Sequence, residues 1–441
     1  MQTPIVDFVR KYADKNGVRA HMPGHKGKSL LGAEKGDITE ISGADVLYNA
    51  SGIIKQSQDN ASKLFGTYAT FYSTEGSSLC IKAMLYLVAK GKRNPTVLAL
   101  RNAHKTFVYG CALLGIEPVW VYPKNSEHLC ECNVSADDID EALKSLDKKP
   151  FAVYVTSPDY LGNMLDIQSI ATVCDRYGVP LIVDNAHGAY LAFIKENEHP
   201  IKKGAAMCCD SAHKTLSALT GGAYLHIGDK GKVFADGAKN ALSLFASTSP
   251  SYLILQSLDL VNADVEKNLK RFEEVKERVK KIRINLENNG FVCVGNEPFK
   301  LTLDLVKSNV LSENLAYVLD KNGIECEMLD NEYAVFMFST ASKDSDFKCV
   351  QNALLSVQKT ERKPILAFEF NKIERVMSVR EAIMSESERV SVSASLNRVC
   401  ASPTVSCPPA VPIVVSGERI TQQSIALFAR YGIDEIEVVK E

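Results

Sequence analysis

Residues 208–226 read CCDSAHKTLSALTGGAYLH and place one lysine, Lys214, between a histidine and a threonine. A short apolar stretch precedes this lysine, and a Gly-Gly pair and a second apolar stretch follow it. A lysine at a strand end is most often simply solvated, because lysine is almost never fully buried without a partner. The surrounding chain has to show whether Lys214 has another use.

Apolar runs like these alternate with amphipathic segments along the chain. Six such runs end in polar residues, Gly or Pro: 95–105, 117–123, 150–158, 179–188, 206–214 and 221–228. Between them, residues 135–149 and 166–178 have helical spacing, each beginning at Ser or Asp and the second ending at Gly. Strands that are apolar throughout and separated by helices indicate an α/β fold with a mostly parallel sheet covered on both faces.

In such a sheet, ligands bind at the carboxyl ends of the strands. Five polar residues stand at these ends, in four of the runs: His104, Ser157, Asp184, His187 and Lys214. We therefore expect a ligand site at this edge of the sheet.

The composition limits the class of protein. The 441 residues are 46% hydrophobic and 24% charged with a net charge of −2, enough for a large core in two or three domains. No basic field for nucleic acid or membrane binding is present, and no apolar run approaches the ~18–20 residues of a spanning helix. The first residues lack the order of a signal peptide, so we expect a cytoplasmic protein that acts on a small molecule.

The twelve cysteines lie mostly in apolar stretches, as expected for reduced, buried thiols. Cys130 and Cys132 form a C-x-C pair with no second pair at zinc spacing, so we expect no metal.

We predict four parts: an N-terminal segment (1–55), a large ligand-binding domain (56–255), a linking helix (256–290) and a smaller α+β domain (291–441). The helix prediction rests on apolar residues spaced by three and four over roughly 256–288, ending at Asn-Asn-Gly.

The strand-end residues together suit pyridoxal phosphate, which needs a lysine for an imine, an acid at the ring nitrogen, a stacking group and a phosphate site. Lys214, Asp184 and His104 are the candidates for the first three. Asp184 could equally be a helix cap, and a single histidine is more often a satisfied core residue.

The stretch STEGSS (73–78) precedes the helical run LCIKAMLYLVAK and can form the phosphate site. Gly76, Ser77 and Ser78 would present backbone N–H groups and hydroxyls at a helix N-terminus, supplemented by Ser211 and His213. Ordinary helix capping is the alternative interpretation of this stretch.

The order of these motifs resembles the bacterial ornithine/lysine/arginine decarboxylases in their short form, which are fold-type I pyridoxal-phosphate enzymes. The resemblance runs through RAHMPGHKG (19–27), STEGSS (73–78), RNAHKT (101–106), VDNAHGAYLAF (183–193) and SAHKTLSALTGGAYLH (211–226). It continues to STSPSYLILQSLD (247–259), RVMSVREAIMSESERV (375–390) and CPPAVPIVVSGERI (407–420).

The resemblance implies a role for each matching residue. Lys214 would bind the cofactor covalently, Asp184 would pair with the ring nitrogen, and His104 and Ala186 would lie on the two ring faces. The remaining cofactor contacts would be Gly76, Ser77, Ser78, His187, Ser211 and His213. Thr248 would reach the phosphate of a neighbouring subunit, which implies a homodimer with shared active sites.

The sequence departs from the family at four places. The family usually has an acidic residue at Asn185, a proline near Ala50, an aromatic at Cys407 and a glycine at Ala410. These departures leave the cofactor residues intact and bear on the substrate pocket.

The resulting hypothesis is a decarboxylase of arginine, lysine or ornithine that yields an amine of the polyamine type, with His213 or Lys214 returning the proton. A buried cationic side chain needs an acid, and Glu327 and Asp330 of GIECEMLDNEY (323–333) are the candidates. The alternatives are another pyridoxal-phosphate reaction, such as an aminotransferase or lyase, or a binding protein without catalysis. An aminotransferase would use an arginine of the small domain, for which Arg375, Arg380 and Arg398 are available.

Overall fold

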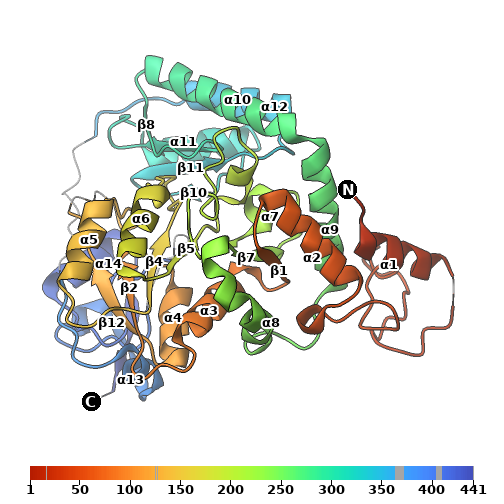
Figure 1. The fold of residues 1–441 in the computed structure, drawn as a ribbon. Coiled ribbons are helices and arrows are strands. Elements are labelled where there is room, and N and C mark those ends of the chain that lie inside the picture. Colours follow the sequence, from red (N-terminus) through yellow and green to blue (C-terminus); the bar gives the residue numbers. More distant parts are fainter. Residues whose placement is uncertain (16, 125, 127, 363–371, 404–409, 441) are drawn as a thin grey trace.

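The computed structural model describes the chain from residue 1 to 440 except residues 16, 125, 127, 363–371 and 404–409 (Figure 1). Its centre is a seven-stranded sheet with the order β1-β7-β6-β5-β4-β2-β3. The strands are β1 (Ala69–Ser73), β2 (Thr96–Leu100), β3 (Glu117–Val121), β4 (Ala152–Thr156), β5 (Leu181–Asp184), β6 (Met207–Asp210) and β7 (Ala223–Ile227). The six predicted runs each contain one of these strands, and β1 is the strand that the run analysis missed.

The sheet is mostly parallel, as the sequence predicts. Strands β3, β2, β4, β5 and β6 pair in parallel, whereas β7 is antiparallel to both of its neighbours, β6 and β1. The carboxyl ends of six strands therefore meet the beginning of β7 at one edge. This edge holds the residues that follow β1 to β6 and those that precede β7.

Helices cover both faces of this sheet (Figure 1). One face packs against α3 (Gly76–Ala89), α4 (Lys105–Leu114) and α8 (Ala235–Ser243). The other packs against α5 (Ala136–Lys144) and α6 (Ile167–Tyr177). The predicted boundaries of α6 hold because Asp166 caps its first turn through Ser169 N–H and Gly178 ends it at a φ of 56°.

The amino-terminal part and the short helices complete the large unit around the sheet. Its remaining elements are α1 (Pro4–Asp14), η1 (Leu47–Asn49), α2 (Ile53–Phe65), η2 (Ala189–Ala192), α7 (Ala212–Thr215) and η3 (Asp229–Phe234). Helix α7 is the single turn that carries Lys214 directly after β6.

The predicted linking helix is two helices, α9 (Tyr252–Lys267) and α10 (Leu269–Asn288), which meet at Asn268. The sequence predicts one continuous helix because the apolar spacing continues through Leu269. This prediction is wrong: the helix is interrupted at Asn268, and Leu269 is 46% exposed. Asn268 donates its side-chain amide to Asp264 and favours a cap over a helix interior.

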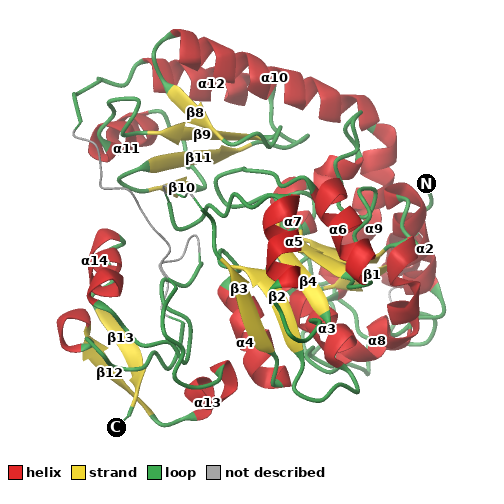
Figure 2. Cartoon of the chain, turned by 60° about the vertical axis from the view of Figure 1, so that its left-hand side comes forward, coloured by secondary structure: helices red, strands yellow, loops and turns green. Residues whose placement is uncertain are grey.

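Beyond α10 the chain forms two separate sheets (Figure 2). The first has the order β10-β11-β9-β8, and α10 and α12 pack beside it. Its elements are β8 (Val292–Val294), β9 (Lys300–Asp304), α11 (Ser312–Lys321), β10 (Met328–Leu329), β11 (Tyr333–Met337) and α12 (Asp344–Leu355). The second pairs β12 with β13, and its elements are α13 (Val379–Met384), β12 (Ser387–Ser391), η4 (Val392–Ala394), α14 (Gln422–Arg430) and β13 (Glu435–Val439).

The structure also bears on two further expectations, the state of the cysteines and the presence of membrane-spanning helices. The eleven cysteines within the described residues are free thiols, and eight of them are buried. No helix of the described chain combines the length and apolar character that crossing a membrane requires.

Candidate active site

A cavity of about 560 Å³ lies at the edge where the strands of the large sheet end. Its walls include Lys214, Asp184, His104, His187 and Ala186, which the sequence placed at or near strand ends. Residues from the second half of the chain, Glu327, Ala410 and Val411, also line it.

Lys214 is not a solvated surface lysine. Its Nζ lies 3.0 Å from Nε2 of His187 inside the cavity. Burial lowers the pKa of Lys214 below its usual value, although Asp184 and Glu327 act in the opposite direction. A lowered pKa leaves more of the amine neutral, which is the form that can attack a carbonyl carbon.

Asp184 is the last residue of β5, and its side chain is 3% exposed. Tyr154 donates its hydroxyl to Oδ2 at 3.2 Å, and the backbone N–H of Ala186 donates to Oδ1 at 3.2 Å. Asp184 thus fixes the turn after the strand and also presents a carboxylate to the cavity. It is not a helix cap, because the next helix, η2, has Gly188 as its N-cap.

His104 is the N-cap of α4, and its ring also lines the cavity. Its Nδ1 accepts the backbone N–H of Thr106 at 3.1 Å, so in the neutral ring the proton is on Nε2. Burial lowers the pKa of His104, which favours this neutral form, although Asp184 opposes the shift. The flat, uncharged ring suits a stacking role.

The start of α3 lines the cavity and has no side-chain cap, and we call its residues Gly76, Ser77 and Ser78 the α3 cradle. Glu75 is the N-cap and makes no side-chain capping hydrogen bond. The expectation that the Gly76 N–H is available to a ligand is wrong, because it donates to the carbonyl oxygen of Gly221 at 2.8 Å. Ser211 donates its hydroxyl to Ser77 Oγ at 2.8 Å, which joins the end of β6 to this cradle. Gly221 completes it, since a Cβ there would lie 2.8 Å from the carbonyl oxygen of Thr74.

His213 lies next to the cradle and lines the same cavity. Its Nδ1 lies 3.0 Å from the carbonyl oxygen of Gly222, so Nδ1 carries the proton and donates it there. Burial lowers the pKa of His213. Its Nε2 is therefore the nitrogen available for a ligand.

The two predicted substrate acids separate in the structure. Glu327 lines the cavity, and Tyr160 donates its hydroxyl to Glu327 Oε1 at 2.6 Å. Asp330 does not line it. Its Oδ1 accepts the N–H groups of Glu332 and Tyr333, each at 2.7 Å, and its Oδ2 lies 3.4 Å from His128.

The prediction that Asp330 faces the substrate is wrong, because its oxygens hold the turn between β10 and β11. Among the strand-end residues, Ser157 is also turned away and accepts the N–H of Leu165 at 3.0 Å.

Thr248 is exposed and lies outside the cavity. The neighbouring N–H of Ser247 donates to Glu75 Oε1 at 2.8 Å, so this loop runs beside the cradle. The prediction that Thr248 reaches a partner's phosphate stays a prediction.

The structure gives two of the sequence departures a physical setting. Asn185 donates its amide to Asp210 Oδ1 at 2.7 Å, beneath the site. His199 and His226 lie 3.0 and 3.2 Å from Asp210 Oδ2. Burial alone would raise the pKa of Asp210, but the two histidines outweigh it and lower that pKa below its usual range. In this buried network Asp210 supplies the carboxylate, and Asn185 supplies the amide that donates to it.

Ala410 lines the cavity with a φ of 57°, a left-handed conformation that favours glycine. Its carbonyl accepts the N–H of Lys105 at 2.9 Å, next to His104. The family's usual glycine at this position therefore has a backbone reason. Cys407, the other departure in this segment, lies outside the described residues.

Several cavity residues were missed by the sequence analysis. Thr156 ends β4 and Pro158, Asp159 and Tyr160 follow it, where the strand end was noted but only Ser157 was named. Asn102, Cys130 and Thr220 line the cavity as well, and only the neighbouring motifs pointed to them.

The sheet, the cavity at its carboxyl edge and the lysine after β6 define the fold of type I pyridoxal-phosphate-dependent enzymes. The lysine decarboxylase LdcF of Francisella novicida has this fold: it superposes with a TM-score of 0.82 over 99% of this chain and 81% of its own, at 17% identity.

The chain belongs to the Orn/Lys/Arg decarboxylase family. The profile of the family's major domain matches residues 3–300, and that of its C-terminal domain matches residues 363–431. The uncharacterized protein YaaO of Bacillus subtilis is 28% identical, with 98% of this chain and 94% of YaaO covered. The arginine decarboxylase of Halalkalibacterium halodurans is also 28% identical, with 96% and 92% covered.

Proposed function

We propose that this protein is a pyridoxal-phosphate-dependent decarboxylase of a basic amino acid, arginine, lysine or ornithine. One observation carries the proposal: Lys214, Asp184 and His104 line a single cavity that also contains the carboxylate of Glu327. Family membership supports decarboxylation, and the acid in the cavity supports a cationic substrate.

The residues present fit pyridoxal phosphate. The cavity of about 560 Å³ lies within the usual range for a ligand of this size. Lys214 would hold the aldehyde carbon, Asp184 a proton on the ring nitrogen, and the α3 cradle with Ser211 the phosphate. When bound, the cofactor supplies an electron-accepting ring that takes up the electron pair left by a departing carboxylate.

The chain's own groups orient the substrate and handle the proton. Glu327, held by the Tyr160 hydroxyl, would bind the distal ammonium or guanidinium of the substrate. The proton that replaces the carboxylate would come from Lys214 Nζ or from Nε2 of a doubly protonated His213, whose Nδ1–H stays bound to the Gly222 carbonyl.

The placement of three arginines favours this reaction over transamination. Arg375 pairs with Glu117, Arg380 donates to the carbonyls of Ala112 and Leu113, and Arg398 pairs with Glu388. None of these arginines lines the cavity, and no arginine is among its described lining residues. The cavity residues that the structure describes thus include no arginine that would retain the α-carboxylate.

The test is product analysis with arginine, lysine and ornithine, each supplied with pyridoxal phosphate. We expect equal amounts of carbon dioxide and amine from at least one substrate, and none from Lys214→Ala. A keto acid without carbon dioxide would contradict the proposal, and so would turnover by Lys214→Ala.

We also propose a cytoplasmic homodimer in which Thr248 of one subunit completes the site of the other. The support is the position of the Ser247 loop beside Glu75 at the cavity wall. Mixed dimers of Lys214→Ala and Thr248→Ala subunits test it. One fully native site per mixed dimer, with native cofactor affinity, is expected if Thr248 acts across the interface, and no native site if it acts within its own subunit.

A further inference from the structure

Lys300 is a buried cation next to the candidate active site that the sequence analysis did not single out. It begins β9, and its side chain is 1% exposed. Its Nζ lies 3.3 and 3.4 Å from the carbonyl oxygens of Asp159 and Tyr160, and 3.4 Å from Glu297 Oε2. These neighbours are hydrogen-bond acceptors, so Lys300 serves them as a charged ammonium donor.

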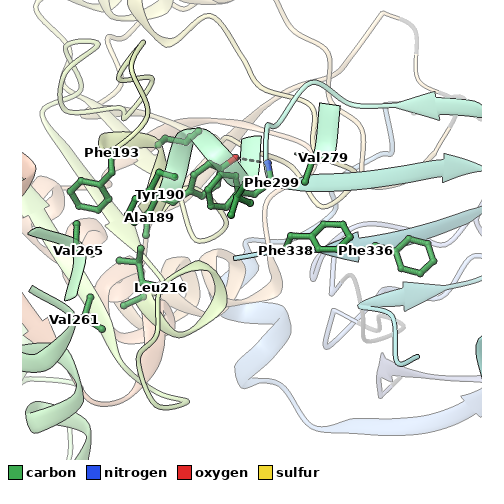
Figure 3. Packing of buried hydrophobic residues seen from close by; sticks show 14 of the residues in the cluster. Ala189, Tyr190, Phe193, Leu216, Val261, Val265, Val279, Phe299, Phe336 and Phe338 are labelled. Carbon is green, nitrogen blue, oxygen red and sulfur yellow. Dashed lines mark hydrogen bonds between the residues drawn. The ribbon is translucent and has the colours of Figure 1, made fainter. Parts of the chain in front are cut away.

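The backbone that holds Lys300 is fixed against the segment after β5. Phe299 stacks on Tyr190 with ring centres 3.8 Å apart and an angle of 11° between the planes (Figure 3). The N–H of Phe299 donates to the Tyr190 hydroxyl at 3.1 Å, and that hydroxyl in turn donates to Glu297. These contacts therefore fix the position of Lys300 relative to the segment that follows Asp184.

A further neighbour of the Lys300 ammonium is a histidine of the active site. Its Nζ lies 3.3 Å from His187 Nδ1, and Nε2 on the other side of this ring lies 3.0 Å from Lys214 Nζ. An ammonium that donates to Nδ1 leaves the proton of the neutral ring on Nε2. Nε2–H can then donate only to a Lys214 amine that has a lone pair, which is the neutral form.

We infer that Lys300 is a positioning residue that acts on Lys214 through His187: it fixes the His187 tautomer and thereby favours the neutral amine of Lys214. The inference rests on the proposed function for the role of Lys214, but the arrangement of the three side chains stands without a cofactor. It assigns a part in the chemistry to the C-terminal half of the chain, from a strand that does not line the cavity.

The charges around His187 all act in one direction, whereas those around Lys214 oppose one another. Burial lowers the pKa of His187 well below its usual value, and Lys214, Lys300, His104 and His213 add to the effect. His187 is therefore the neutral partner. Lys214 faces Asp184 and Glu327, which raise its pKa, and Lys300, which lowers it. Removing Lys300 takes away both the tautomer lock and a positive charge.

The experiment measures the reactivity of Lys214 in the full-length chain freed of cofactor. Trace acetylation with acetic anhydride at a series of pH values, followed by peptide mass spectrometry, gives the fraction of neutral amine at each lysine. We expect Lys300→Met to lower the rate at Lys214 about tenfold near neutral pH, which corresponds to a pKa higher by about one. Lys307→Met is the matched control, because Lys307 lies beyond the far end of β9 beside Asp304, and it should leave the rate unchanged.

A second background separates action through His187 from action through charge alone. In His187→Gln, the substitution Lys300→Met should lose most of its effect on Lys214, because the relay is already broken. An equal fall in both backgrounds would overturn the inference, and so would an unchanged rate in Lys300→Met. If Lys300→Met fails to fold because Glu297 is left unpaired, Lys300→Met combined with Glu297→Gln removes both charges and gives the same readout.

A direct readout is the protonation of the ring itself. In the chain labelled with ¹⁵N-histidine, the His187 nitrogen shifts should show a bare Nδ1 and a protonated Nε2, and a mixture of tautomers in Lys300→Met. A protonated Nδ1 in the native chain would contradict the relay. None of these measurements requires decarboxylation, so the inference and the proposed function can fail separately.

Discussion

The two walls of the cavity differ in where their residues come from in the chain. The first wall is built by the ends of neighbouring strands in one sheet and carries Asp184, Lys214 and the α3 cradle. The second wall comes from residues more than a hundred positions later, Glu327, Ala410 and Val411, in loops outside that sheet. Figure 2 shows the sheet of β8–β11 above the large sheet and the pair β12 and β13 to its left.

This difference separates two tasks. The first wall carries groups that suit the cofactor, and a rigid sheet holds them at fixed positions. The second wall carries a carboxylate on a loop, where substitution changes a pocket without disturbing the sheet. Changes to the first wall should therefore lower kcat or cofactor binding, and changes to the second should raise KM.

The largest effect is expected for Asp184→Asn on the first wall. An amide cannot stabilise a protonated ring nitrogen as a carboxylate does, so we expect kcat to fall by about 100-fold or more. The cofactor should still bind, as its absorbance will show. Tyr154→Phe, which removes one donor to Asp184, should cost less. Near-native turnover in Asp184→Asn would mean that the electron sink is built differently.

Ser211→Ala should weaken the binding of the cofactor and leave the binding of the substrate unchanged. A hydrogen bond to a charged group contributes about 1.5–3 kcal/mol, so the dissociation constant of pyridoxal phosphate should rise about 10- to 100-fold. Titration followed by fluorescence measures it, with Ser217→Ala at an exposed neighbouring position as control. Unchanged affinity would place the phosphate away from the α3 cradle.

Glu327→Gln tests the second wall. We expect kcat/KM for the best basic substrate to fall about tenfold or more, equivalent to about 1.4 kcal/mol, mainly through KM. The control is Glu325→Gln, an exposed acid two residues earlier that does not line the cavity. If both variants have the same kinetics, Glu327 does not bind the substrate and is only a surface charge.

The smallest effect is expected for Tyr160→Phe, which removes only the hydroxyl that holds Glu327. A net contribution of about 0.5–1.5 kcal/mol corresponds to a rise in KM of roughly two- to tenfold. In the Glu327→Gln background the substitution should have little further effect, because its partner is already changed. Fully additive effects would show that Tyr160 acts on the substrate independently.

The sequence predicts the first wall well because strands and site coincide. Asp184 ends an apolar run and Lys214 follows another, and parallel strands bring such ends to one edge. The second wall has no comparable rule: Glu327 and Asp330 lie three residues apart, and only the turn geometry turns one toward the cavity and the other onto backbone N–H groups. Lys300 gave no signal, since a lysine that opens a strand is usually solvated.

The central claim is tested most directly by finding the residue that binds the cofactor. The protein is loaded with pyridoxal phosphate, reduced with borohydride and digested, and the labelled peptide is identified by mass spectrometry. The account predicts a single label on Lys214, in the peptide that contains Ser211 and His213. A label on Lys105 or Lys26, or none after loading, would contradict it.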